Sequence, residues 1–218
     1  MHLPLLFHKG PMKTRSLRTL ALALSLGTAW LLCLSACGDT SAPVALTGPA
    51  RDLQAAAAAM RTVATFKFTA KIVTGAQTAQ ISGEFATPDN LHETAQIGGQ
   101  FVELIRVGSR TVVRSAPNAA WTKTTGAGSS AATDPRAAFA VLGSATDVTM
   151  SGSSYAFTLT GAAAASLVQG AATVTGTATL TGGRISALSY KAAAPPVSVD
   201  LAYSNFNGGP AIILPPGV

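Results

Sequence analysis

The stretch TFKFTAKI, residues 65–72, carries an apolar side chain at every second position. Phe66, Phe68, Ala70 and Ile72 alternate with threonines and lysines. Because successive side chains of a strand point to opposite faces, this period of two predicts a strand with one apolar and one polar face. A sheet of such strands needs a second layer over its apolar face.

The same alternation continues in further segments along most of the chain. Turn-forming residues separate them, among them Gly75, Pro88-Asp89-Asn90, Gly98-Gly99 and Gly182-Gly183. Strands joined by short glycine-containing turns are typical of an antiparallel meander. Besides 65–72, we expect strands at residues 79–85, 91–97, 101–107, 110–114, 146–150, 155–160, 173–181, 184–191 and 197–206.

Helical patterns occur in two or three places. Residues 51–63 include five consecutive alanines, which are strong helix formers. Thr133-Asp134-Pro135 predicts the start of a second helix that ends at Gly143, with Thr133 or Asp134 as its cap, and residues 162–168 predict one or two further turns. A large antiparallel sheet with two or three helices is an α+β domain. The apolar face of the first helix comprises Leu53, Ala56, Met60 and Val63.

The beginning of the chain has the layout of a secretory signal. Lys13, Arg15 and Arg18 precede a nearly uncharged apolar run at residues 19–34. The sequence Leu34-Ser35-Ala36-Cys37-Gly38 follows, and it resembles the lipobox of bacterial lipoproteins. The lipobox implies that Cys37 is acylated and becomes the first residue of the mature protein. The alternative is an uncleaved transmembrane anchor, because residues 19–36 approach the length that spans a bilayer.

These features divide the chain into three parts. Residues 1–36 form the expected signal peptide, and 1–11 are a candidate misassigned start because Met12-Lys13 opens the basic segment. Residues 37–49 form the lipidated cysteine and a flexible tether, and residues 50–218 form the folded domain. Four basic residues leave with the signal peptide, so the mature part has eleven basic and nine acidic residues. A net charge of +2 without a basic cluster argues against nucleic-acid binding.

Chemistry-bearing motifs are scarce after Cys37. The single histidine there, His92, would have to serve any Ser-His-Asp triad, and the strand pattern favours a solvent-facing position instead. A hydrolase requires His92 within hydrogen-bond reach of a serine or a carboxylate. Neither a G-x-S-x-G nor an H-E-x-x-H motif occurs, and cysteine spacing for zinc is absent, so we expect no enzyme, no metal and no cofactor.

Two weaker patterns have simpler explanations. Residues 126–131, Gly-Ala-Gly-Ser-Ser-Ala, superficially fit a dinucleotide-binding loop, but no strand leads into them, which favours an ordinary loop. Glu84, Asp89, Glu93 and Glu103 lie close in sequence and could provide a pair of carboxylates. Solvated strand faces also explain these four acids.

Several segments of the mature chain form a recognisable pattern. The lipobox, the tether and the alanine-rich helix lead into Phe66-Lys67-Phe68. The further segments are Phe101-Val102-Glu103-Leu104-Ile105-Arg106-Val107-Gly108, Trp121, Tyr203-Ser204-Asn205-Phe206, Gly208-Gly209-Pro210 and the end from Ile212 to Pro216. Over nearly the whole mature chain, roughly 51 to 216, this pattern resembles the actinobacterial LppX/LprG group of lipoproteins within the wider LolA-like fold.

The resemblance implies a curved antiparallel half-barrel with helices on its concave side and an apolar cavity that carries acyl chains. The chain is then a non-enzymatic, monomeric lipid carrier on the extracytoplasmic face of the cell membrane. Its expected partners are the membrane, through the anchor on Cys37, a lipid or lipoglycan cargo and an export protein. The abundance of alanine and glycine departs from better-known members and leaves the size of the cavity open.

Twelve apolar residues are candidates for the wall of this cavity, and ordinary core packing is the alternative for each. A carrier requires a continuous apolar cavity of roughly several hundred Å³. A surface adaptor or sensor with the same fold requires none. Trp121 could lie at the mouth of the cavity or plug the sheet edge. The candidates are Phe66, Phe68, Ile72, Ile81, Phe85, Phe101, Ile105, Trp121, Phe157, Leu159, Leu180 and Leu188.

Overall fold

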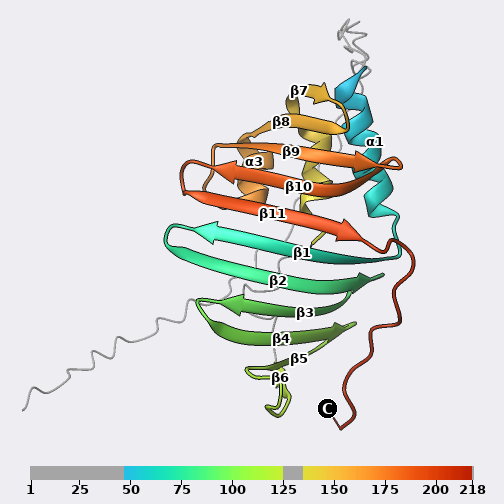
Figure 1. The fold of residues 1–218 in the computed structure, drawn as a ribbon, viewed down its shortest axis with the longest axis vertical. Coiled ribbons are helices and arrows are strands. Elements are labelled where there is room, and N and C mark those ends of the chain that lie inside the picture. Colours follow the sequence, from blue (N-terminus) through green and yellow to red (C-terminus); the bar gives the residue numbers. More distant parts are fainter. Residues whose placement is uncertain (1–46, 125–134, 218) are drawn as a thin grey trace, which may run out of the picture. The chain divides into compact units, whose positions relative to one another are not determined.

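The structure is a computed structural model that describes residues 47–124 and 135–217. The predicted signal peptide, Cys37 and the glycine-containing residues 126–131 lie outside the described residues. The described part contains one antiparallel sheet of eleven strands (Figure 1). The strands are β1 (Thr65–Thr74), β2 (Gln77–Ala86), β3 (Asn90–Ile97), β4 (Gln100–Val107), β5 (Arg110–Arg114), β6 (Thr122–Thr124), β7 (Thr146–Ser151), β8 (Ser154–Thr160), β9 (Thr173–Thr181), β10 (Arg184–Ala192) and β11 (Val197–Ser204).

The sheet is a meander whose first and last strands meet in its middle. Its order is β6-β5-β4-β3-β2-β1-β11-β10-β9-β8-β7, so only the pairing of β1 with β11 joins strands that are far apart in sequence. That pairing runs from Lys67 opposite Ser204 to Thr74 opposite Val197. Local hairpins therefore form both halves of the sheet, and the β1–β11 pair holds the halves together.

The strand register defines two faces of the sheet. The inner face carries Phe66, Phe68, Ala70 and Ile72 of β1, which are the alternating apolar positions of residues 65–72. Phe68 lies opposite Gly83 on one side and Tyr203 on the other. The outer face carries the intervening lysines and threonines. Most of the buried side chains lie on the inner face, in one core with the helices.

Three α-helices and a short 3-10 helix cover part of the inner face. They are α1 (Pro49–Arg61), α2 (Ala137–Val141), η1 (Leu142–Ser144) and α3 (Gly161–Leu167). Helix α1 packs against β7 and β10, and α3 packs against β8 and β9, so the helices lie behind the β7–β11 half of the sheet in Figure 1. Helix α1 buries Leu53, Ala56 and Met60, as its sequence period predicts. In the described residues, no helix has both the length and the apolarity to cross a membrane.

The α+β class, the curved open sheet and the helices on its concave side are confirmed. Strand β6 was not predicted because three residues are too short to show a period. Helix α2 begins at Ala137 with Arg136 at the N-cap, so the prediction that Pro135 opens the helix is wrong. The proposed capping residues Thr133 and Asp134 lie outside the described residues.

Two glycines let aromatic rings lie flat on the inner face. A Cβ built on Gly83 would lie 2.8 Å from Cζ of Phe68, and one on Gly176 would lie 2.5 Å from Cζ of Phe157. Each ring therefore occupies the position that a side chain on the neighbouring strand would fill. This packing brings the ring of Phe68 next to β3, the strand on the far side of Gly83.

The C-terminal segment covers part of the outer face. The backbone N–H of Asn207 donates to the carbonyl of Thr65 at 2.7 Å, and the Asn207 side chain accepts from the Ala64 N–H at 2.8 Å. Beyond this anchor, Ile212 packs against Ile105 and Val112 in a second, smaller apolar cluster. Part of β4 and β5 is therefore covered on the face that a simple two-layer domain would leave to solvent.

Candidate functional site

A narrow apolar pocket lies between the middle of the sheet and the helices α2 and α3. Strands β1, β2, β3, β10 and β11 supply one wall. Residues at the start of α2 and at the end of α3 supply the other. Its volume is about 60 Å³. The lining residues are Phe68, Ala70, Ile72, Ile81, Glu93, Pro135, Ala137, Ala138, Ser166, Leu167, Tyr190, Val199 and Leu201.

This volume is far below what the carrier hypothesis requires. Ligand pockets usually enclose roughly 300 to 1,000 Å³, whereas 60 Å³ corresponds to only about two water molecules. Larger hollows of about 390 and 460 Å³ lie on the outer face, but polar residues such as Lys67, Ser82 and Thr94 line them and they open widely to solvent. The apolar pocket in the described residues is therefore smaller than the cavity that a carrier requires.

Glu93 is the charged member of the pocket wall. It lies on the inner face of β3, opposite Gly83 of β2 and Leu104 of β4, and it is only 3% exposed. Its carboxylate makes no hydrogen bond or ion pair in the described part of the chain. Burial raises the pKa of Glu93 to about 7, and the positive charge of Arg106 partly opposes this rise.

A chain of ionic contacts occupies the outer face of the neighbouring strands. Glu103 accepts a hydrogen bond from His92 Nε2 at 2.8 Å and from Arg114 Nε at 2.5 Å. Arg114 also donates to the carbonyl of Pro117 and lies 4.6 Å from the ring centre of Trp121. Burial alone would raise the pKa of Glu103, but the two partners outweigh it, and the pKa lies below its ordinary value.

His92 fulfils one requirement of a hydrolase without the others. It lies within reach of a carboxylate, as a catalytic histidine must, yet its side chain is 39% exposed on an open strand face. The nearby hydroxyls of Ser82 and Thr94 bond to each other at 2.9 Å, and in the described residues no serine bonds to His92. The geometry is that of a strand histidine hydrogen-bonded to a carboxylate, and it lacks a nucleophile.

Replacing Glu103 by glutamine is expected to destabilise the domain by about 1 to 2 kcal/mol at pH 7, because Arg114 and His92 lose a charged acceptor. A carboxyl whose folded-state pKa is lowered stabilises the fold above its unfolded pKa, and this contribution disappears as the pH falls through the folded pKa. The difference between wild type and Glu103→Gln should therefore shrink from pH 7 to pH 3 in urea denaturation. A difference that grows on acidification would contradict this assignment.

The structure divides the twelve cavity candidates between the two faces. Nine lie on the inner face, but only Phe68, Ile72 and Ile81 line the pocket. Phe66 and Phe85 stack on each other at 5.1 Å inside the core. The other inner-face residues, Phe157, Leu159, Leu180 and Leu188, pack in the same core.

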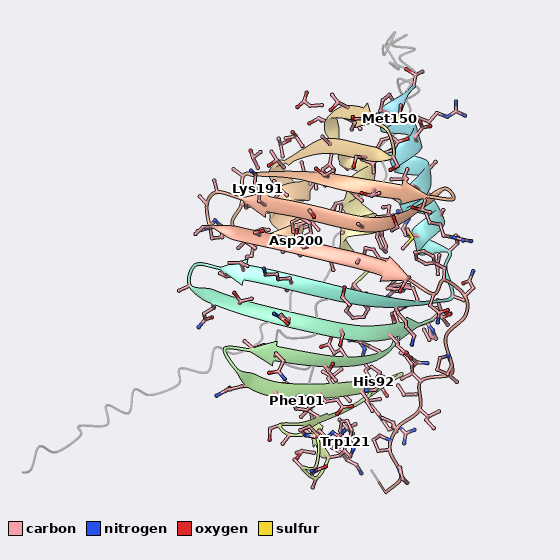
Figure 2. All side chains as sticks on the ribbon, in the orientation of Figure 1. His92, Phe101, Trp121, Met150, Lys191 and Asp200 are labelled. Carbon is pink, nitrogen blue, oxygen red and sulfur yellow. The ribbon has the colours of Figure 1, made fainter. Side chains whose placement is uncertain are left out.

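The prediction that Phe101, Ile105 and Trp121 line the cavity is wrong, because none of the three lines the pocket. Phe101 and Ile105 pair with Gln96 and His92 and therefore lie on the outer face. Trp121 directly precedes the edge strand β6 and packs with Ile105 in the cluster beneath the C-terminal segment. It therefore does not lie at the mouth of the pocket, and its position agrees with the alternative of packing at the sheet edge. Figure 2 shows His92, Phe101 and Trp121 in the β3–β6 half of the sheet, away from the helices.

The four acids singled out in the sequence do not form a carboxylate pair. Glu93 and Glu103 lie on opposite faces, Glu84 bonds to Lys67 at 2.9 Å and Asp89 to Arg136 at 2.9 Å. Solvated strand faces do not explain Glu93 and Glu103, which are both buried. In the described ranges, no group of three or more potential metal ligands comes together.

Comparison with known proteins identifies the fold. The chain matches no family model and no curated protein. Among solved structures, the lipoprotein LppX of Mycobacterium tuberculosis aligns over 75% of this chain and 97% of its own, at 12% identity and a TM-score of 0.56. LprF of Mycobacterium bovis aligns over 78% and 97%, at 12% identity and a TM-score of 0.58.

The chain has an LppX-type lipoprotein fold. At 12% identity the agreement concerns the fold, and it confirms the resemblance that the sequence pattern indicates at that level. In this LppX-type domain, the pocket with Glu93 lies where the sheet and the short helices α2 and α3 meet. The sequence already carries a signal for Glu93, because the residue has the same phase as Leu91 and Ala95 in β3.

Proposed function

We propose that this chain is a membrane-anchored lipoprotein that binds lipid acyl chains between the inner face of its sheet and helices α2 and α3. The observation that carries the proposal is the apolar pocket at this interface, in a domain with an LppX-type fold. The lipobox at Cys37 supports an anchor on the extracytoplasmic face of the membrane. Lipid or lipoglycan cargo and an export partner complete the proposed setting.

An acyl chain requires the pocket to widen, because its present volume is about 60 Å³. The helices that would move are small. Helix α2 has five residues, α3 has seven, and the pocket side of α2 is formed by Ala137 and Ala138. Alanine buries little apolar area, so moving these helices from the sheet costs little hydrophobic free energy. Burial of each CH₂ group of the entering chain contributes about 0.8 kcal/mol of favourable binding free energy.

The proposed role is binding, without catalysis. The described residues include one histidine, and the geometry of His92 provides neither a nucleophile nor a free carboxylate. The pocket wall has a single carboxyl, Glu93, so it also lacks the pair of acids that general acid and base chemistry requires.

Ala137→Phe is expected to abolish lipid binding, because the new ring would fill the pocket between α2 and the sheet. The full-length protein, with its covalent anchor, is purified by chromatography in buffer without added lipid. It is then extracted with organic solvent. The lipid that was held without a covalent bond is then quantified per protein by mass spectrometry. We expect stoichiometric lipid from the wild type and none from the variant.

Ala140→Phe is the matched control, since Ala140 lies on the exposed side of the same helix. It should retain the lipid of the wild type. Wild-type protein without extractable lipid would refute the proposal, and so would equal amounts of lipid in the Ala137→Phe variant.

A surface adaptor or sensor without cargo is the second candidate. The nearly filled interface between the sheet and the helices favours it, because an adaptor needs no cavity. The same extraction separates the two functions, since an adaptor yields only the covalently attached anchor lipid.

A further inference from the structure

Glu93 differs from the neighbouring acids in having no partner. Glu84 forms an ion pair with Lys67, Glu103 with Arg114, and Asp89 with Arg136. Glu93 is more deeply buried than any of these, yet no described group donates a hydrogen bond to it. In the described residues, every side-chain oxygen or nitrogen that is closed to solvent has a hydrogen-bond partner, so the carboxyl oxygens of Glu93 reach the accessible surface of the pocket. A carboxyl that faces the pocket without a donor from the protein is open to a donor on a ligand.

The elements around Glu93 supply almost no charge. On the sheet, β2 presents Gly83, β4 presents Leu104 and Arg106, and β1 presents the ring of Phe68. Among the described cations, Arg106 is the one whose charge acts on the pKa of Glu93, and its Nε already donates to the carbonyl of Asp89 at 3.0 Å. Arg136, beside the pocket residue Pro135, lies over the ring of Phe85 and pairs with Asp89. The remaining pocket residues near α2, α3 and β10 are Pro135, Ala137, Ala138, Ser166, Leu167 and Tyr190.

We propose that the pocket selects amphiphiles with an amine at the root of a single alkyl chain, and that Glu93 receives the ammonium group. This inference rests on the proposed function, because the alkyl chain needs the same widening of the pocket. An ammonium provides three donors and a positive charge, and both match an isolated carboxylate in a site of low dielectric constant. The aromatic rings of Phe68 and Tyr190 in the same wall add a favourable surface for a cation.

The site should also discriminate against anions. A fatty-acid carboxylate would place a second negative charge beside Glu93, and like charges in one site oppose each other. A neutral alcohol of the same length can donate a single hydrogen bond and should bind with intermediate affinity. Because the pKa of Glu93 is about 7, the carboxyl is largely ionised at pH 8 and largely neutral at pH 6. The preference for the amine should therefore weaken on acidification.

The test compares dodecylamine, dodecanol and dodecanoate by titration calorimetry with the full-length protein at pH 8. Dodecanol is kept below its solubility limit, and the other two probes are kept below their critical micelle concentrations. We expect the amine to bind at least about tenfold more tightly than the alcohol, a difference of about 1.4 kcal/mol, and the carboxylate to bind most weakly. Glu93→Gln should remove the order among the probes. The matched control is Glu84→Gln, which changes an acid on the outer face and should preserve the order.

Each outcome bears on a specific claim. Equal affinities for the three probes, or an unchanged order in Glu93→Gln, would overturn the selectivity and leave the proposed lipid binding in place. Failure of all three probes to bind would overturn both claims. Thermal unfolding of Glu93→Gln shows whether the variant is folded, and the glutamine is nearly the same size as the glutamate it replaces.

Discussion

Replacing Phe66 by alanine is expected to lower the free energy of unfolding by about 3 to 5 kcal/mol. Phe66 is 1% exposed and stacks on Phe85, with ring centres 5.1 Å apart. Its ring also meets the edges of Tyr203 at 5.7 Å and Phe68 at 6.3 Å. The substitution removes this packing and leaves a cavity where β1, β2 and β11 meet. Since small domains are stable by only about 5 to 15 kcal/mol, the loss should be plain in urea denaturation.

Phe101→Ala provides the matched control. Phe101 lies on the outer face of β4 and is only half-buried, so the same truncation there should cost about 1 kcal/mol. Comparable losses at the two positions would contradict the assignment of Phe66 to the core and Phe101 to the outer face.

Replacing Glu93 by glutamine is expected to raise the free energy of unfolding by about 3 kcal/mol at pH 8 and to leave it nearly unchanged at pH 4. The folded state raises the pKa of this carboxyl from 4.5 to about 7 because burial disfavours the charge. Between these values the folded protein holds a proton that the unfolded chain has released, so the contribution of Glu93 to stability falls as the pH rises. One pKa unit corresponds to about 1.4 kcal/mol.

Urea denaturation of both proteins from pH 4 to pH 8 measures this effect. Glu103→Gln serves as the comparison, because its pKa is shifted in the opposite direction and its pH trend should have the opposite sign. An effect of Glu93→Gln that does not change with pH would show that the carboxyl is solvated.

The strand pattern predicts the faces of the sheet well where only one face is covered. In β1 the apolar residues from Phe66 to Ile72 share one phase, and the structure places them on the inner face. In β4 both phases contain apolar residues, because the C-terminal segment covers Ile105 while the core buries Leu104. A period of two cannot tell these faces apart. The misplacement of Ile105 therefore has a physical cause in the contact with Ile212, which is distant in sequence. Phe101 shares the outer-face phase of Ile105 in β4.

The two buried acids show different limits of prediction. Glu93 has the phase of the buried residues in β3, so its position could have been predicted from the alternation. Burial of Glu103 depends on Arg114, which lies directly opposite it on β5. That contact requires the strand register, which the sequence alone does not determine.

The size of the pocket depends on how closely the helices approach the sheet. The abundance of alanine in the sequence left the size of the cavity open. In the structure, Ala56, Ala138 and Ala164 are almost completely buried, because small side chains let the helices approach closely. The same composition thus produces a nearly filled interface, and any cavity for cargo must come from movement of the helices.

The position of a bound acyl chain tests the central claim most directly. A fatty amine with a photoreactive diazirine near the end of its chain is bound to the full-length protein and irradiated, and peptide mass spectrometry identifies the labelled residues. We predict labels on the inner face at Ile72, Ile81 and Leu201, and competition by unlabelled dodecylamine. Labels confined to the outer face, at Ile105 or Ile212, would contradict the account, as would labelling that the competitor does not reduce.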